Sequence, residues 1–292
     1  TKSWRVDEFL PLATGFYKGV QKAAGARVWH EKKTVRVLKS EDEMMAWGEK
    51  RRDAGFAGYL SQPWIVPGGV SDGVNAGWGA FEMTGGGYVD LPVFLDVVRK
   101  VLGEDYRAGE VRCEDVDVTG SGVTWGGIKA KYLVFCQGFE GAKNRYFDWV
   151  PFRSAKGEVL EVAIDGYGDG RVINSGGWLL PLADGRFRAG STYSWDPLDS
   201  VVTKAGRQRI VKNLRRLLVP EIAVVDQRAA VRPIINASKV LMGLHPTHGR
   251  IGFFNGLGSK GVLNGPYFAQ QLAAHLVEGA PIEEEADLRK NG

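Results

Sequence analysis

Apolar residues recur at helical spacing in several segments of this chain. Between residues 90 and 102 they occupy positions 91, 94, 95, 98 and 102, which lie on one side of a helix. Pro92 falls in the first turn of this segment, where proline is tolerated, and Gly103 follows its last residue. Ser40 is a candidate N-cap for a more polar segment. The predicted helices are residues 6–24, 41–54, 90–102, 203–218 and 262–278.

Other segments alternate between apolar and polar residues, or are short and apolar, as strands do. Residues 131–136 are almost all apolar, which is typical of a strand buried on both faces. Ala183-Asp184-Gly185 separates two short strands and predicts a hairpin turn. The predicted strands are residues 27–38, 111–118, 123–125, 130–136, 159–164, 178–181, 186–190 and 250–255. The segment 61–87, rich in glycine, proline and tryptophan, is interpreted as loops and short strands, so the fold class is α+β.

The composition is that of a globular protein with one large domain or two joined ones. The chain has 292 residues, of which 44% are hydrophobic and 25% are charged. Its 40 glycines follow no repeat, which excludes collagen and favours many turns. The formal net charge of +4 is too small to indicate nucleic-acid binding. Cys113 and Cys136 form no CxxC pair, so neither a zinc site nor a disulfide scaffold is predicted.

We expect a cytoplasmic protein with no membrane partner. No apolar run approaches the 18 or so residues that a membrane-spanning helix needs. The first residues, TKSWRVD, lack the apolar core of a signal peptide.

The loop GLGSKG (residues 256–261) matches the pattern GxGxxG between a predicted strand and a predicted helix. A dinucleotide-binding βαβ unit needs a second strand and an acidic residue further on. The last helix ends at Gly279-Ala280-Pro281 and little chain follows, so we reject that interpretation. A glycine turn before a helix still exposes free N–H groups to an anionic or electron-rich ligand. A purely structural turn is the alternative.

Three further features permit a functional or a structural interpretation. Arg232 follows an apolar strand and could bind a carboxylate, although most arginines are surface residues. His245 and His248 have the spacing of two metal ligands, but no third ligand is nearby, and solvated loop histidines are favoured. The basic helix within residues 203–218 is interpreted as a solvated face.

Five sequence blocks in order resemble the FAD-dependent D-amino-acid oxidase/glycine oxidase superfamily. The blocks span nearly the whole chain, and each is weakly specific by itself. They are GGYVDLP (86–92), YLVFCQG (132–138), PFRSAKGEVL (151–160), WLLP with DGRFRAGSTY (178–193), and VRP with NGLGSKGVLNGP (231–266).

The resemblance implies a two-domain fold, FAD as cofactor, and a small amine or amino acid as substrate. A hydride would pass from the substrate carbon to flavin N5, and the imine would hydrolyse. By position, Arg232 and Lys260 would bind the substrate. The cofactor would contact Gly138, Gly256, Leu257, Gly258, Ser259, Lys260, Gly261 and Val262. The resemblance assigns no catalytic residue and no metal.

Two local departures leave the substrate open. Glycine oxidases often carry Arg-Asn where this chain has Ser259-Lys260, and residues 236–243 also differ from the family's sequence motif. The Ser-Lys-Gly motif is also similar to the corresponding motif in the oxidase domain of the tRNA wobble-uridine modifying enzyme. Membership of that group is the less favoured alternative.

Family members begin with a βαβ unit that binds the ADP half of FAD, and this sequence opens beyond it. From this we expect weak or absent FAD retention and inactivity of the chain alone, unless an N-terminal partner chain supplies the unit. The alternatives are one half of a split oxidase, or a non-catalytic binding or assembly module that has lost flavin. The predicted domains are an incomplete FAD-binding domain (1–26, 88–150 and 226–292) and an antiparallel-sheet substrate domain (27–87 and 151–225).

Overall fold

The computed structural model describes residues 3–56, 58–71, 73–83 and 85–291. The chain divides into two compact units. Unit 1 contains Trp29–Asp90 and Lys156–Ala230, and unit 2 contains Ser3–Val28, Leu91–Ala155 and the chain from Val231 onward. Among the described residues, no helix is long and apolar enough to cross a membrane.

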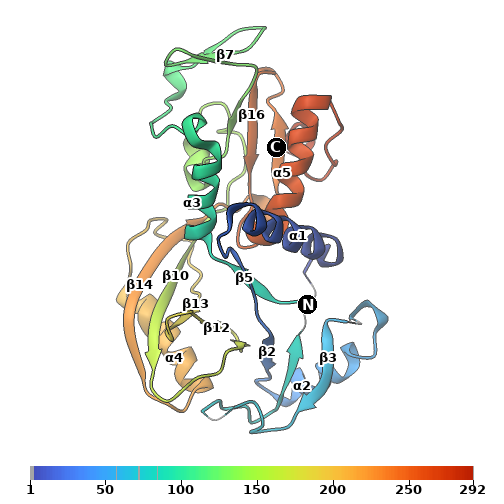
Figure 1. Ribbon diagram of the computed structural model, residues 1–292, viewed down its shortest axis with the longest axis vertical. Helices are drawn as coiled ribbons and strands as arrows, with labels where there is room; N and C mark the ends of the chain where they lie inside the picture. The colour runs from blue at the N-terminus through green and yellow to red at the C-terminus, as the bar shows by residue number, and fades with distance from the viewer. Residues whose placement is uncertain (1–2, 57, 72, 84, 292) are drawn as a thin grey trace. The chain divides into compact units, whose positions relative to one another are not determined.

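Within the described residues of unit 1, eight strands form one mixed sheet in the order β14-β10-β13-β12-β11-β2-β4-β3 (Figure 1). Most neighbours are antiparallel, whereas β11 pairs with β2 in parallel. A short antiparallel pair joins β1 to β5. The strands are β1 (Trp29–Glu31), β2 (Thr34–Val37), β3 (Leu60–Ile65), β4 (Ala80–Met83), β5 (Gly87–Val89), β10 (Ala155–Ile164), β11 (Val172–Asn174), β12 (Trp178–Pro181), β13 (Phe187–Gly190) and β14 (Ile222–Arg232).

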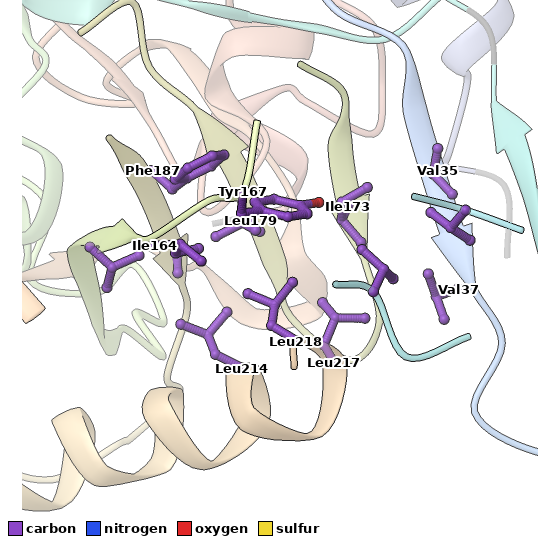
Figure 2. Close-up of a cluster of buried hydrophobic side chains, with 14 of the residues drawn as sticks. Val35, Val37, Ile164, Tyr167, Ile173, Leu179, Phe187, Leu214, Leu217 and Leu218 are labelled. Carbon is purple, nitrogen blue, oxygen red and sulfur yellow. The ribbon is translucent and has the colours of Figure 1, made fainter. Parts of the chain in front are cut away.

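Helix α4 (Lys204–Leu217) covers part of this sheet because three of its apolar residues recur at intervals of three to four. Ile210, Leu214 and Leu217 are buried against Leu179 and other strand residues. Figure 2 shows Leu214 and Leu217 pointing from the helix toward the strands. The smaller helix α2 (Glu41–Lys50) buries Trp47 against Phe81.

A buried carboxylate holds the start of α4 to the sheet. Glu158 on β10 is only 4% exposed. It accepts hydrogen bonds from the Thr203 backbone N–H (2.8 Å), the Thr203 hydroxyl (2.6 Å) and Gln227 Nε2 (2.7 Å). Burial raises the pKa of this carboxyl, but the hydrogen bonds outweigh it, so the pKa lies below its ordinary value. Gly206 leaves room for this carboxylate, because a β-carbon at position 206 would overlap the carboxylate oxygens of Glu158.

Within the described residues of unit 2, a three-stranded sheet has the order β15-β16-β9 and a second has the order β6-β7-β8. The strands are β6 (Asp117–Val118), β7 (Val123–Trp125), β8 (Ile128–Ala130), β9 (Leu133–Phe135), β15 (Leu241–Leu244) and β16 (Ile251–Asn255). The helices are α1 (Val6–Ala24), α3 (Leu91–Leu102), α5 (Gly261–Glu278) and α6 (Leu288–Asn291).

The apolar faces of α1 and α5 meet through Phe9, Phe268 and their neighbours in one buried cluster. Arg5 joins the two helices and the C-terminal segment at the surface. Its guanidinium donates to both carboxylate oxygens of Glu283, at 2.6 and 3.1 Å, and to the Tyr267 hydroxyl at 2.7 Å. It also lies 5.0 Å from the centre of the Phe9 ring.

Most predicted elements are present, but the predicted strand 27–38 is divided into β1 and β2, the predicted helix 41–54 ends at Lys50, and strands β11 and β15 and most of β14 were not predicted. Two further differences are informative. The segment predicted as a strand over 111–118 contains a 3₁₀ turn (Cys113–Asp115), and only Asp117–Val118 pairs. The backbone N–H of Asp115 donates to the Arg112 carbonyl, so backbone groups of this segment are paired within the turn rather than with a neighbouring strand. Strand β9 is half-buried at Leu133 and Val134 rather than buried on both faces.

Candidate cofactor and substrate site

The site in unit 2 is built where two parallel strands end. Strand β9 pairs with β16 in parallel, with Leu133 opposite Ile251 and Phe135 opposite Phe253. Their carboxyl ends therefore meet at one edge of the sheet, where ligands bind in open α/β sheets. From this edge β9 continues into residues 136–138, and β16 continues into the glycine loop 256–260 and then α5 (Figure 1).

Asn255 bonds the two loops to each other. Its side chain is 3% exposed. The amide nitrogen Nδ2 donates to the Gly138 carbonyl oxygen at 2.8 Å, and Oδ1 accepts from the Gly256 N–H at 2.9 Å. A single buried amide thus satisfies one backbone group in each loop and fixes their separation.

A second buried asparagine supports the loop after β9. Asn144 is 4% exposed, and its Nδ2 donates to Gln137 Oε1 at 2.8 Å. Its Oδ1 accepts from the Tyr146 N–H at 2.9 Å. The turn at Gln137-Gly138 is therefore held from both sides, by Asn144 and by Asn255.

The glycine loop requires its first glycine. Gly256 has φ 83°, and a β-carbon there would overlap the Lys239 carbonyl oxygen. The loop then turns directly into α5, whose first described backbone bonds run from Leu263 and Asn264 to the Lys260 carbonyl.

Several polar groups at the start of α5 have no partner in the described part of the chain. The backbone N–H groups of Ser259, Gly261 and Val262 make no hydrogen bond there. The Asn264 side chain is 9% exposed, and its Oδ1 is also unsatisfied among those residues. Residues 255–264 contain no acidic side chain. Free N–H groups and the positive end of the helix dipole favour an electron-rich ligand here.

The segment after β14 lies against the same loop. The Gly258 N–H donates to the Pro233 carbonyl at 3.1 Å, and the Arg153 N–H donates to the Ile234 carbonyl at 2.6 Å. Arg232, the last residue of β14, is half-buried directly before Pro233. Lys260 is exposed at the N-cap of α5. Two cationic side chains therefore belong to the segments that meet at the loop.

The predicted cofactor residues Gly138 and 256–262 thus lie on two loops that are bonded to each other and in the first turn of α5. Lys260 is the last residue of the glycine loop, and Arg232 belongs to a segment that adjoins it. Sequence reasoning missed Asn255, Asn144 and Asn264. The only local signal for Asn255 is a polar residue between an apolar strand and a glycine turn.

The two histidines lie elsewhere in unit 2. His245 and His248 occupy the turn between β15 and β16, at the amino end of β16 and so away from Asn255. Their ring centres are 4.8 Å apart, and His245 Nδ1 accepts from the backbone N–H groups of Thr247 and His248. Within the described residues no group of three or more potential ligands could hold a metal ion.

The family model described as FAD dependent oxidoreductase matches residues 9–275. The chain belongs to this family of FAD-dependent oxidoreductases.

Solved structures share its fold. Glycine oxidase from Geobacillus kaustophilus superposes with a TM-score of 0.77 at 19% identity, covering 94% of this chain and 78% of that chain. Iminodiacetate oxidase from Chelativorans sp. BNC1 gives a TM-score of 0.78 at 17% identity, and the match covers 95% of this chain and 80% of that chain. L-proline dehydrogenase from P. horikoshii gives a TM-score of 0.71 at 14% identity, and the match covers 94% of this chain and 79% of that chain.

The residues present fit the flavin end of FAD. Unpaired N–H groups at a helix N-terminus suit the electron-rich pyrimidine edge of a flavin, and the loop carries no carboxylate to repel it. The absence of a β-carbon at Gly256 lets the loop lie close to the Lys239 carbonyl and the Ile235 side chain.

Proposed function

We propose that this FAD-dependent oxidoreductase oxidises a small amine or amino acid that carries a carboxylate. The observation that carries the proposal is the junction of three segments: the loop after β9, the loop before α5, and Pro233-Ile234 directly after Arg232. The loop before α5 would supply N–H groups for a flavin, and the third segment would bring the guanidinium of Arg232 toward the same edge. The named structural neighbours, glycine oxidase and iminodiacetate oxidase, support this substrate class.

When bound, FAD would supply the two-electron acceptor for a hydride from the substrate carbon next to nitrogen. The N–H groups of Ser259, Gly261 and Val262 would hold its pyrimidine edge and stabilise the negative charge that reduction places there. Arg232 would bind the substrate carboxylate in bidentate fashion and so orient the carbon to be oxidised. Lys260 would add a second positive charge at the loop. The imine product would hydrolyse after release.

The proposal is tested by flavin absorbance between 350 and 500 nm, after incubation with excess FAD and desalting. Bound flavin is then mixed without oxygen with glycine, sarcosine, iminodiacetate, L-proline or D-alanine. We expect little flavin to be retained by the chain alone, and we expect at least one of these compounds to bleach whatever flavin is bound. Arg232→Ala should raise the half-saturating substrate concentration at least tenfold, with a smaller effect on the limiting rate.

Arg228→Ala is the matched control. Arg228 lies four residues earlier on β14, is exposed, and pairs with Asp226 at 2.8 Å. The Arg228→Ala variant should keep the half-saturating substrate concentration and the limiting rate within twofold of those of the unmodified protein. A colourless protein after desalting would agree with the weak FAD retention expected of this sequence alone, whereas bound flavin that none of these compounds bleaches would overturn the proposed substrate class. A flavin-bearing protein in which Arg232→Ala and Arg228→Ala behave alike would remove Arg232 from the substrate site.

A further inference from the structure

An open groove of about 860 Å³ runs between α4 and β14 on unit 1. Three apolar side chains contribute to its lining, Val211 from the helix and Ile222 and Val224 from the strand. Five basic side chains of α4 also line it: Lys204, Arg207, Lys212, Arg215 and Arg216. The groove therefore combines an apolar strip with a cationic wall.

The five basic residues are spread along the side of α4 that lines the groove, and together they are called the stripe. Lys204, Arg207, Lys212 and Arg215–Arg216 recur at intervals of three to five, and the stripe extends for about 18 Å at 1.5 Å per residue. The side of α4 that carries Leu214 and Leu217 faces the strands, as Figure 2 shows. Core packing therefore accounts for the apolar side of α4 and does not account for the stripe.

The charge of the stripe is uncompensated within the described residues. None of its five side chains forms an ion pair there, whereas Arg171, Arg186 and Arg228 of the same unit each pair with a carboxylate. Glu221 precedes Ile222 in sequence but does not line the groove. Like charges at helical spacing repel each other, so an anionic ligand along the stripe would relieve that repulsion.

We propose that the groove binds an acidic amphipathic segment of a partner protein. Carboxylates of the segment would pair with the stripe, and its apolar side chains would cover Val211, Ile222 and Val224. Among the described residues that line the groove there is no aromatic side chain, so they offer no platform on which nucleic-acid bases could stack. The apolar strip is recessed between helix and strand rather than projecting, which disfavours insertion into a lipid surface.

The test measures binding by fluorescence anisotropy of a labelled helical peptide of about four turns. The peptide carries leucines along one side and glutamates flanking them, and a scrambled peptide has the same composition. We expect the ordered peptide to bind at least fivefold more tightly than the scrambled one. Arg207→Glu should weaken its binding at least fivefold, and Val224→Ser should weaken it at least threefold.

Arg209→Glu is the matched control, because Arg209 is an exposed arginine on the same helix that does not line the groove. It should change the affinity less than twofold, and circular dichroism should show that all variants are folded. Equal effects at Arg207 and Arg209, or equal binding of the two peptides, would overturn the proposal in favour of non-specific charge attraction. Tighter binding of single-stranded DNA or of phosphatidylserine vesicles, lost in Arg207→Glu, would replace it with a nucleic-acid or membrane site.

Discussion

Replacing Asn255 with leucine removes the link between the two loops at the carboxyl ends of β9 and β16. Leucine has nearly the same size, so little cavity is created at this buried position. It leaves the Gly138 carbonyl and the Gly256 N–H without the partners they have at 2.8 and 2.9 Å. An orphaned buried polar group costs about 1–3 kcal/mol, so two should lower the free energy of unfolding by about 2–6 kcal/mol.

Asn255→Asp separates the two bonds. A carboxylate oxygen can still accept from the Gly256 N–H, but it cannot donate to the Gly138 carbonyl. We expect this variant to lose stability, with the amide of Gly256 still protected from hydrogen exchange. In Asn255→Leu that amide should exchange faster, by about tenfold for each 1.4 kcal/mol of lost protection.

The assay is urea unfolding followed by circular dichroism, combined with hydrogen exchange at Gly256. The control is Asn213→Leu, the same replacement at an exposed position of α4, which should change stability by no more than about 0.5 kcal/mol. If Asn255→Leu matches this control in both measurements, the two backbone groups have other partners and Asn255 does not connect the loops. If FAD binds, Asn255→Leu should also weaken its affinity at least tenfold.

Two changes at the start of α4 test the buried carboxylate. Glu158→Gln should lower the free energy of unfolding by about 1–3 kcal/mol at pH 7. Because the folded-state pKa of Glu158 is lowered, its contribution is present above the unfolded value of about 4.3 and is lost as the pH falls through the folded value. Urea titrations should therefore converge for the two proteins only once the pH is below the lowered folded-state pKa of Glu158, and a gap that persists in that acid range would contradict the role of charge. Gly206→Ala should destabilise by about 1–3 kcal/mol because its β-carbon overlaps the Glu158 carboxylate, whereas Gly15→Ala, in open space within α1, should stabilise by about 0.5–1 kcal/mol in the same titrations.

Local periodicity predicted the elements whose pattern is strong. The helices over 6–24, 90–102, 203–218 and 262–278 lie within one residue of their positions in the structure, and the hairpin around Asp184-Gly185 is present. These features depend on neighbours a few residues apart, which a single sequence displays directly. The segment 111–118 was mispredicted because its alternation is short and a local 3₁₀ turn satisfies its backbone instead.

The ordered sequence blocks indicated the family, and the family model confirms that membership. They also singled out Arg232 and the glycine loop as site candidates, and those roles stay predictions. Only the tertiary structure decided that β9 and β16, more than a hundred residues apart in sequence, run parallel and bring Gly138 to Gly256 through Asn255. It likewise decided that Glu158 is buried against Thr203 and that the basic residues of α4 border an apolar strip. Such contacts join distant segments, and their stability comes from burial and hydrogen bonds that exist only once both segments are in place, so no local pattern encodes them.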